Sequence, residues 1–208
     1  MSKKKDLTII IIFIVIGVLI FGFLGYKIKT DFKTEKKEEV VKEKTLRNLE
    51  LYGYTLSEND TELYKSVFKD LEAALNEEPI NYQDYAKLAS ELFIIDVYTL
   101  NNKISSTDIG GNEFLHKDLK SNFNENMGLS LYRNIQSNID GKREQQLPEV
   151  SKIEATDVTE GKYNYNGVDY DAYTVTLNWE YVVDMGYQNS MKVTLIKEND
   201  LLYVVKGE

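Results

Sequence analysis

The residue with the clearest capacity for chemistry is Asp96, a single carboxylate inside the apolar run LFIIDVYTL. This run is typical of a helix that is buried on nearly every face. Burial raises the pKa of a carboxyl group unless a cation or a hydrogen-bond donor compensates. Asp96 therefore either serves a binding or catalytic cavity, or accepts hydrogen bonds from backbone amides of the loop at 105–111 and holds it. Because no second titratable partner accompanies it, we expect no enzyme activity.

Two other segments could bind ligands. His116 is the only histidine and the chain has no cysteine, which excludes a structural zinc site, so we expect His116 to be exposed or in a loop. The segment STDIGGN, with Asp108, Gly110 and Gly111, lacks both the lysine of a phosphate-binding loop and the ligand spacing of an EF-hand. We interpret it as a turn, and we expect neither a metal nor a cofactor.

The elements that would position these residues begin with an apolar segment at 7–26, behind a short basic tail at 1–6. As a helix, twenty residues rise about 30 Å, enough to cross the hydrocarbon core of a bilayer. Bulky Phe23, Leu24 and Tyr26 stand where a cleaved signal needs small residues, which favours a permanent anchor. Basic residues flank the segment and would meet the lipid head groups: Lys3, Lys4, Lys5, Lys27 and Lys29.

The orientation of this single-pass anchor follows from less direct signals. Seven lysines lie between residues 27 and 44, so a count of basic residues does not favour an extracytoplasmic domain. The short N-terminal tail is typical of a signal anchor, and on that ground we expect the C-terminal domain outside the cell membrane. A cytoplasmic adaptor remains the alternative topology.

The charge of the chain restricts its partners. The net charge is −9, and ten lysines against six acidic residues precede residue 45, so the remainder carries −13. Nucleic-acid binding needs clustered Lys and Arg to neutralise phosphates. We therefore expect no nucleic-acid partner for the globular part.

The rest of the chain predicts an α+β domain at 57–208, after a charged helical neck at 27–56. Helical periodicity predicts helices with apolar stripes at 63–75, 81–100 and 124–139, the second capped by Asn81. Alternating patterns predict about four antiparallel strands, with Asn166-Gly167 as a hairpin turn: 149–158, 163–165 with 168–181, 190–197 and 201–206. Tyrosines gather in these strands and could form an interaction surface.

This order of three helices before a curved sheet resembles the NTF2-like (cystatin-like) fold. With a tail, one span and a neck in front, the chain resembles VirB8-like components of type IV secretion and conjugation machines. The Asn-Pro-x-Gly turn of that family does not occur, and Pro148 lies only near the start of the strands. The resemblance implies a scaffold at the cell envelope that contacts other membrane or envelope proteins and self-associates.

The same resemblance implies a second hypothesis, because NTF2-like enzymes carry a carboxylate inside the cup of the sheet. Asp96 would be that carboxylate here, and Tyr98 or Tyr173 would supply the hydrogen-bond donor of an isomerase-like or ligand-binding site. The two hypotheses differ in what fills the cup. A scaffold predicts large side chains there, whereas a binder predicts an open cavity lined by Asp96 and aromatic residues.

Overall fold

The computed structural model describes residues 44–208, and Glu43–Glu208 form one compact unit. The expected tail at 1–6, the span at 7–26 and the flanking lysines lie outside the described residues. Within residues 44–208, no helix is long and apolar enough to cross a membrane. The unit has its own hydrophobic core, built from side chains of its helices and strands.

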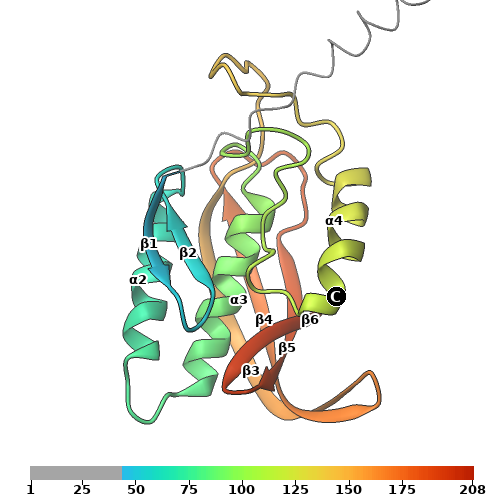
Figure 1. Ribbon diagram of the computed structural model, residues 1–208. Coiled ribbons are helices and arrows are strands. Elements are labelled where there is room, and N and C mark those ends of the chain that lie inside the picture. The colour runs from blue at the N-terminus through green and yellow to red at the C-terminus, as the bar shows by residue number, and fades with distance from the viewer. Residues whose placement is uncertain (1–43) are drawn as a thin grey trace, which may run out of the picture. The chain divides into compact units, whose positions relative to one another are not determined.

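A four-stranded antiparallel sheet forms the C-terminal part of the described chain (Figure 1). Its strands follow each other in chain order: β3 (Val150–Tyr165), β4 (Val168–Tyr181), β5 (Ser190–Glu198) and β6 (Leu201–Gly207). Asn166 and Gly167 both have positive φ, at 52° and 83°, as the expected two-residue hairpin turn requires. The sequence pattern and the turn chemistry thus predicted this sheet correctly, although β3 continues seven residues beyond the predicted strand end.

Helices α2 (Glu62–Leu75) and α3 (Tyr82–Tyr98) precede the sheet, and α3 packs against it (Figure 1). The side chain of Asn81 accepts a hydrogen bond from the backbone N–H of Gln83, which confirms the predicted cap. Residues 92–95 and 97 of α3 are buried. They pack in one core with alternate residues of β4, namely Val175, Leu177 and Trp179. The structure is therefore α+β, with three α-helices and this sheet within residues 44–208.

The predicted helical neck is wrong over its C-terminal part. Residues 45–57 form a hairpin of β1 (Thr45–Leu49) and β2 (Tyr54–Ser57), beside α2 in Figure 1. Charged helix formers predicted a helix here, but tertiary contacts prevail over local propensity. Arg47 forms an ion pair with Glu72 of α2, and the backbone N–H of Thr55 donates to Glu113, 2.8 Å away.

The third helix also differs from its prediction of 124–139. Helix α4 spans Lys120–Leu129 and follows a short 3₁₀ turn, η1 (Lys117–Leu119). The apolar residues after Leu129 are buried as the predicted stripe requires, but the segment that carries them is not helical. Tyr132 and Ile135 pack with Leu100 in a second small core at the end of α3.

Several tyrosines of the expected interaction surface on the sheet pack within the protein itself. Half-buried tyrosines cover a small apolar cluster of Ala172, Ile196 and Val205 on the other side of the sheet from α3: Tyr163, Tyr165, Tyr170 and Tyr203. The segment before η1 runs beside β6, where His116 donates its backbone N–H to Val204. These four tyrosines therefore contribute mainly to packing within the domain, and only their exposed parts are open to partners.

Candidate functional site

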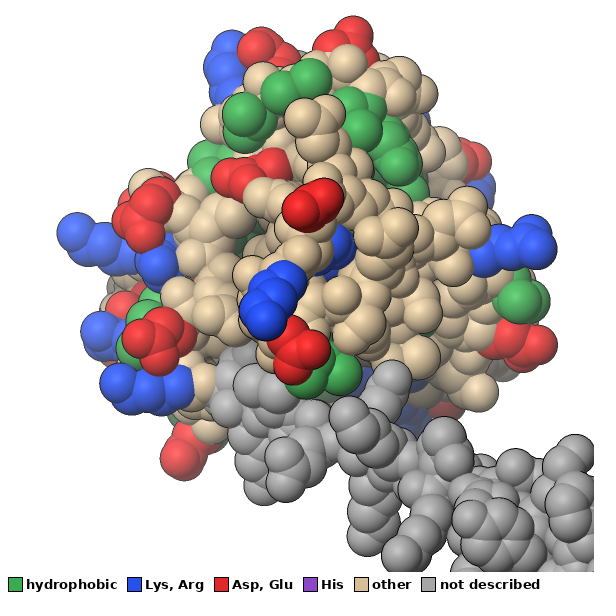
Figure 2. Space-filling model, turned by 90° about the horizontal axis from the view of Figure 1, so that it is seen from above, with side chains coloured by type: hydrophobic (Ala, Val, Ile, Leu, Met, Phe, Trp, Pro, Cys, Tyr) green, Lys and Arg blue, Asp and Glu red, His purple; other side chains and the backbone are tan. Residues whose placement is uncertain are grey.

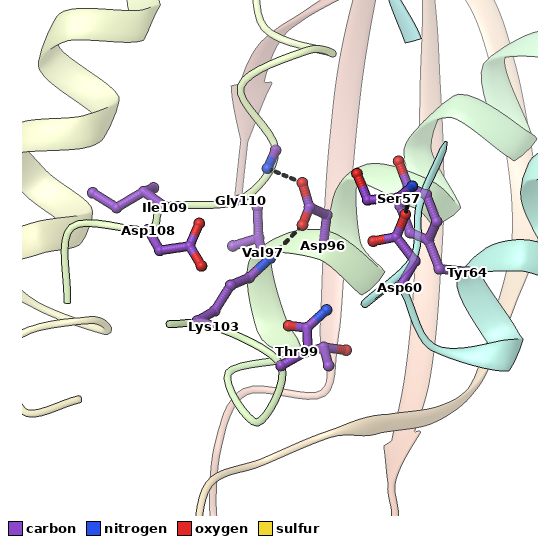
Figure 3. Close-up of polar contacts among 12 residues, drawn as sticks. Ser57, Asp60, Tyr64, Asp96, Val97, Thr99, Lys103, Asp108, Ile109 and Gly110 are labelled. Atoms are coloured by element: carbon purple, nitrogen blue, oxygen red, sulfur yellow. Dashed lines mark hydrogen bonds and ion pairs between the residues drawn. The ribbon is translucent and has the colours of Figure 1, made fainter. Parts of the chain in front are cut away.

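Asp96 lies near the C-terminal end of α3 and holds the following loop by two contacts (Figure 3). One carboxylate oxygen accepts a hydrogen bond from the backbone N–H of Gly111 at 2.5 Å. The other lies 2.5 Å from Nζ of Lys103, with which it forms an ion pair. The interpretation that Asp96 holds the loop is thereby confirmed at Gly111, and the compensating cation is Lys103.

Lys103 is almost fully enclosed, since its side chain is only 7% exposed. Burial alone lowers the pKa of its ammonium group, and the Asp96 carboxylate more than offsets that effect, so its pKa lies above the ordinary value. Lys103 therefore carries its charge at neutral pH in the folded protein. Removal of either partner of such a buried pair leaves the other charge buried without compensation, which destabilises the fold.

Tyr132 closes the same network from the segment after α4. Its hydroxyl accepts a hydrogen bond from the N–H of Gly110 at 3.1 Å and donates to the carbonyl of Val97 at 2.8 Å. Burial raises the pKa of this hydroxyl. A Cβ at Gly110 would lie 2.2 Å from the carbonyl oxygen of Asp96, so the loop approaches α3 as closely as only glycine permits.

A polar cavity of about 200 Å³ lies between the β1–β2 hairpin, the end of α3 and the 102–113 loop. Each of its carboxylates accepts a hydrogen bond from a backbone N–H. Two of these bonds link different segments, Asp96 with Gly111 and Glu113 with Thr55, and two are local, Asp60 with Ser57 and Asp108 with Ile104. Lys103 is the one cation among the described residues that line the cavity. Within residues 44–208, no cluster could hold a metal ion. The arrangement therefore joins three segments of the fold.

Tyr98 and Tyr173 do not join Asp96 at this cavity. The Tyr98 hydroxyl donates to the side chain of Gln188 at 3.0 Å, and its ring packs on Trp179. The ring of Tyr173 stacks on Tyr82, with 6.3 Å between centroids. Neither tyrosine lines the cavity that contains Asp96. The expected arrangement of Asp96 with these two donors is therefore wrong, because on α3 Tyr98 faces the sheet while Asp96 faces the loop.

His116 lies in a loop, which is one of the two expected alternatives, but it is not exposed. Its side chain is 6% exposed, and it lies between Asp118 and Glu198, each 3.6 Å from a ring nitrogen. Its ring contacts Tyr165 and Tyr203 edge to face. These contacts come from segments far along the chain, so the local sequence carried no signal for them.

The residues that sequence reasoning missed at the Asp96 site are Lys103, Glu113 and Tyr132. The need for a compensating partner of Asp96 was foreseeable from its apolar surroundings. The identity of that partner was not, because α3 ends at Tyr98 and Lys103 lies beyond it in an irregular loop, where helical spacing no longer predicts contacts. The role of Glu113 could not be predicted either, because its partner Thr55 belongs to the hairpin that was predicted as a helix.

Exposed apolar side chains mark a different region, the loop between β4 and β5. Val182, Val183 and Met185 are 62%, 61% and 39% exposed. We call these three residues the β4–β5 apolar patch. An exposed apolar patch often marks a site of contact with another protein or with a membrane.

The β4–β5 loop lies at the end of the domain where the described chain starts (Figure 1). We call this end the proximal end, because the described chain starts there. Backbone hydrogen bonds close two pairs of segments at this end: the N–H of Glu58 donates to the carbonyl of Lys44 in the hairpin, and the N–H of Val182 donates to the carbonyl of Glu149 in the sheet. Figure 2 looks down on this end and shows apolar side chains gathered along one margin of a mostly polar face.

Comparison with known proteins adds no family for this chain. No protein-family model matches it, and neither does any curated protein or any solved structure. Its function has to be inferred from its own side chains.

Proposed function

We propose that this chain is a membrane-anchored scaffold, a VirB8-like component of a conjugation or secretion assembly at the cell envelope, with an NTF2-like domain outside the membrane. The observation that carries the proposal is the β4–β5 apolar patch at the proximal end. Val182 and Val183 expose more than half of their surface there. Such a surface is typical of a site that another protein covers.

A membrane anchor would favour assembly through the patch. The apolar segment at 7–26 would hold the domain within a thin layer. Tethering raises the effective concentration of a domain for partners in the same layer, to the millimolar range for short flexible linkers. A small contact patch then suffices for assembly.

The filling of the cup also supports a scaffold. Large buried side chains, including Trp179 and Tyr85, occupy much of the space between α3 and the sheet, and Asp96 does not line the hollow that remains beside β5 and β6. The Asp96 carboxylate is engaged by Lys103 and Gly111, which leaves it with a structural task. These contacts account for Asp96 without a substrate.

The partner expected at the patch is another envelope protein with an apolar surface. Asp184 lies within the patch sequence, and residues 45–208 carry −13, so a partner with a basic margin would complement it. Self-association through the same patch is the other outcome that the test below distinguishes.

The test uses the full chain, expressed with its genomic neighbours and purified from membranes. Val183→Lys places a charge in the patch, where its desolvation opposes docking. Val168→Lys is the matched control, since Val168 is 52% exposed but lies at the β3–β4 turn. We expect the amount of envelope protein that co-purifies with Val183→Lys to fall at least about tenfold, which corresponds to about 1.4 kcal/mol of binding free energy.

Val168→Lys should retain those partners. Sedimentation of the purified chain distinguishes a second copy from a different protein. Equal co-purification by both variants would contradict the proposal, and so would recovery of the wild-type chain alone.

A further inference from the structure

A second cavity, of about 280 Å³, lies between α3, α4 and the β5–β6 hairpin. Its walls are mainly aromatic and aliphatic: Phe93, Val97 and Tyr98 of α3, Phe123 and Met127 of α4, and Val204 of β6. It shares no lining residue with the polar cavity around Asp96. It is therefore a separate hollow, on the side of α3 where Asp96 plays no part.

The polar groups around this cavity are already engaged with one another. Lys206 is the charged residue among its lining residues, and its ammonium lies 2.7 Å from the carboxylate of Glu208. The side-chain amides of Asn122 and Asn126 are hydrogen-bonded to each other at the rim. No unpaired charge awaits a ligand here, so the cavity favours an uncharged apolar molecule over an ion.

Helix α4 covers this cavity with little support of its own. None of its residues is fully buried, and Leu129 at its end is 67% exposed. On its other side, Asn124 and Gly128 border an open hollow of about 510 Å³. A helix with so few buried apolar contacts belongs to the low-stability part of a fold, and it can move at small cost.

We propose that this cavity is a binding site for one small, uncharged, apolar molecule and that α4 is its cover. A volume of 280 Å³ equals the share of about nine water molecules in the liquid, so a ligand of roughly that many non-hydrogen atoms fits. Such a volume is too small for a helix of a protein partner, whose diameter with side chains is about 10 Å. The inference goes beyond the scaffold role and does not depend on the tether.

The test uses the fragment of residues 43–208, which has its own core, and n-octanol as the probe. The single tryptophan, Trp179, reports binding, because its ring packs 4.9 Å from that of Tyr98 in the cavity wall. We expect saturable binding of one octanol per domain, with a change in Trp179 fluorescence and a rise in Tm. Octanediol, with a hydroxyl at each end, should bind at least about tenfold more weakly because one hydroxyl would be buried unpaired.

Two variants on α4 locate the site. Asn126→Phe fills the rim of the cavity, whereas Ser121→Phe adds the same ring on an exposed position outside the cavity lining. We expect the first to weaken octanol binding at least about tenfold and the second to change it by less than about twofold. Circular dichroism checks that both variants are folded.

The wild-type fragment alone can already overturn the proposal. Unsaturable binding, or equal affinity for octanol and octanediol, would contradict it whatever the variants do. Because the fragment lacks the anchor, a negative result leaves the scaffold role untouched, and loss of the scaffold role leaves this test unaffected.

Discussion

Removal of the Lys103 ammonium is the sharpest perturbation of the loop site. Lys103→Met keeps the length and apolar stem of the side chain and deletes the charge that faces Asp96, 2.5 Å away. The carboxylate is then left with the Gly111 amide alone. Its side chain is 22% exposed, so water reaches it in part.

The expected cost follows from these exposures. Breaking a buried ion pair by removing one partner costs about 3–5 kcal/mol. Asp96 keeps one hydrogen bond and partial contact with water, so we expect Lys103→Met to lower the free energy of unfolding by about 3 kcal/mol. This loss corresponds to a fall in Tm of about 6–12 °C for a domain of this size. Asp96→Asn leaves the more deeply buried ammonium without a counter-charge, and we expect about 4 kcal/mol or more.

Urea unfolding of the fragment 43–208, followed by Trp179 fluorescence, measures these costs. The double variant lacks both charges and should be less destabilised than Asp96→Asn alone. Lys65→Met is the matched control, since Lys65 pairs with the exposed Glu62 and should cost less than about 1 kcal/mol. A Lys103→Met cost no larger than that of the control, or additive costs in the double variant, would refute the reasoning.

Three further outcomes concern the same loop and the edge of the sheet. Gly110→Ala places a Cβ 2.2 Å from the Asp96 carbonyl oxygen and should cost more than about 3 kcal/mol in the same urea assay, whereas Gly161→Ala, which has open space, should cost less than about 1 kcal/mol. Tyr132→Phe leaves the buried Gly110 N–H and Val97 carbonyl without this partner, and we expect a loss of about 1–3 kcal/mol; a Tm equal to that of the wild type would contradict the hydrogen bonds. Glu91 of α3 accepts a hydrogen bond from the backbone N–H of Ala155 in β3, and burial raises its pKa. The folded state therefore binds this proton more tightly, and stability should fall as pH rises from about 4.5 through the folded pKa and then level off. Glu91→Gln should flatten that slope in unfolding curves between about pH 4 and 7, and an unchanged slope would assign it to other groups.

Local signals predicted the parts of the fold that local physics determines. Asn81 caps α3 because its side chain can bond the first free backbone amide, and Asn166-Gly167 turns because both residues tolerate positive φ. The alternation from Val175 to Trp179 gave the buried face of β4, since side chains alternate along any strand.

The parts that the sequence did not predict depend on distant contacts. The β1–β2 hairpin has an exposed first strand and a buried Tyr54 in its second strand, and it is held by contacts with Glu72 and Glu113, neither of which is near it in the chain. The stripe at Tyr132 and Ile135 has helical spacing, yet it packs against Leu100 as an irregular segment. At the candidate site, Asp96 was found from its apolar neighbours, while Lys103 could be identified only in space.

The central claim is that the β4–β5 apolar patch binds another protein of the envelope. Site-specific photo-crosslinking in cells tests it most directly, with a photoreactive amino acid placed in the full chain at position 183 or, as the control, at position 168. The scaffold role predicts discrete cross-linked products with membrane or envelope proteins from position 183 and few from position 168. Equal yields from both positions, or none from position 183, would contradict it.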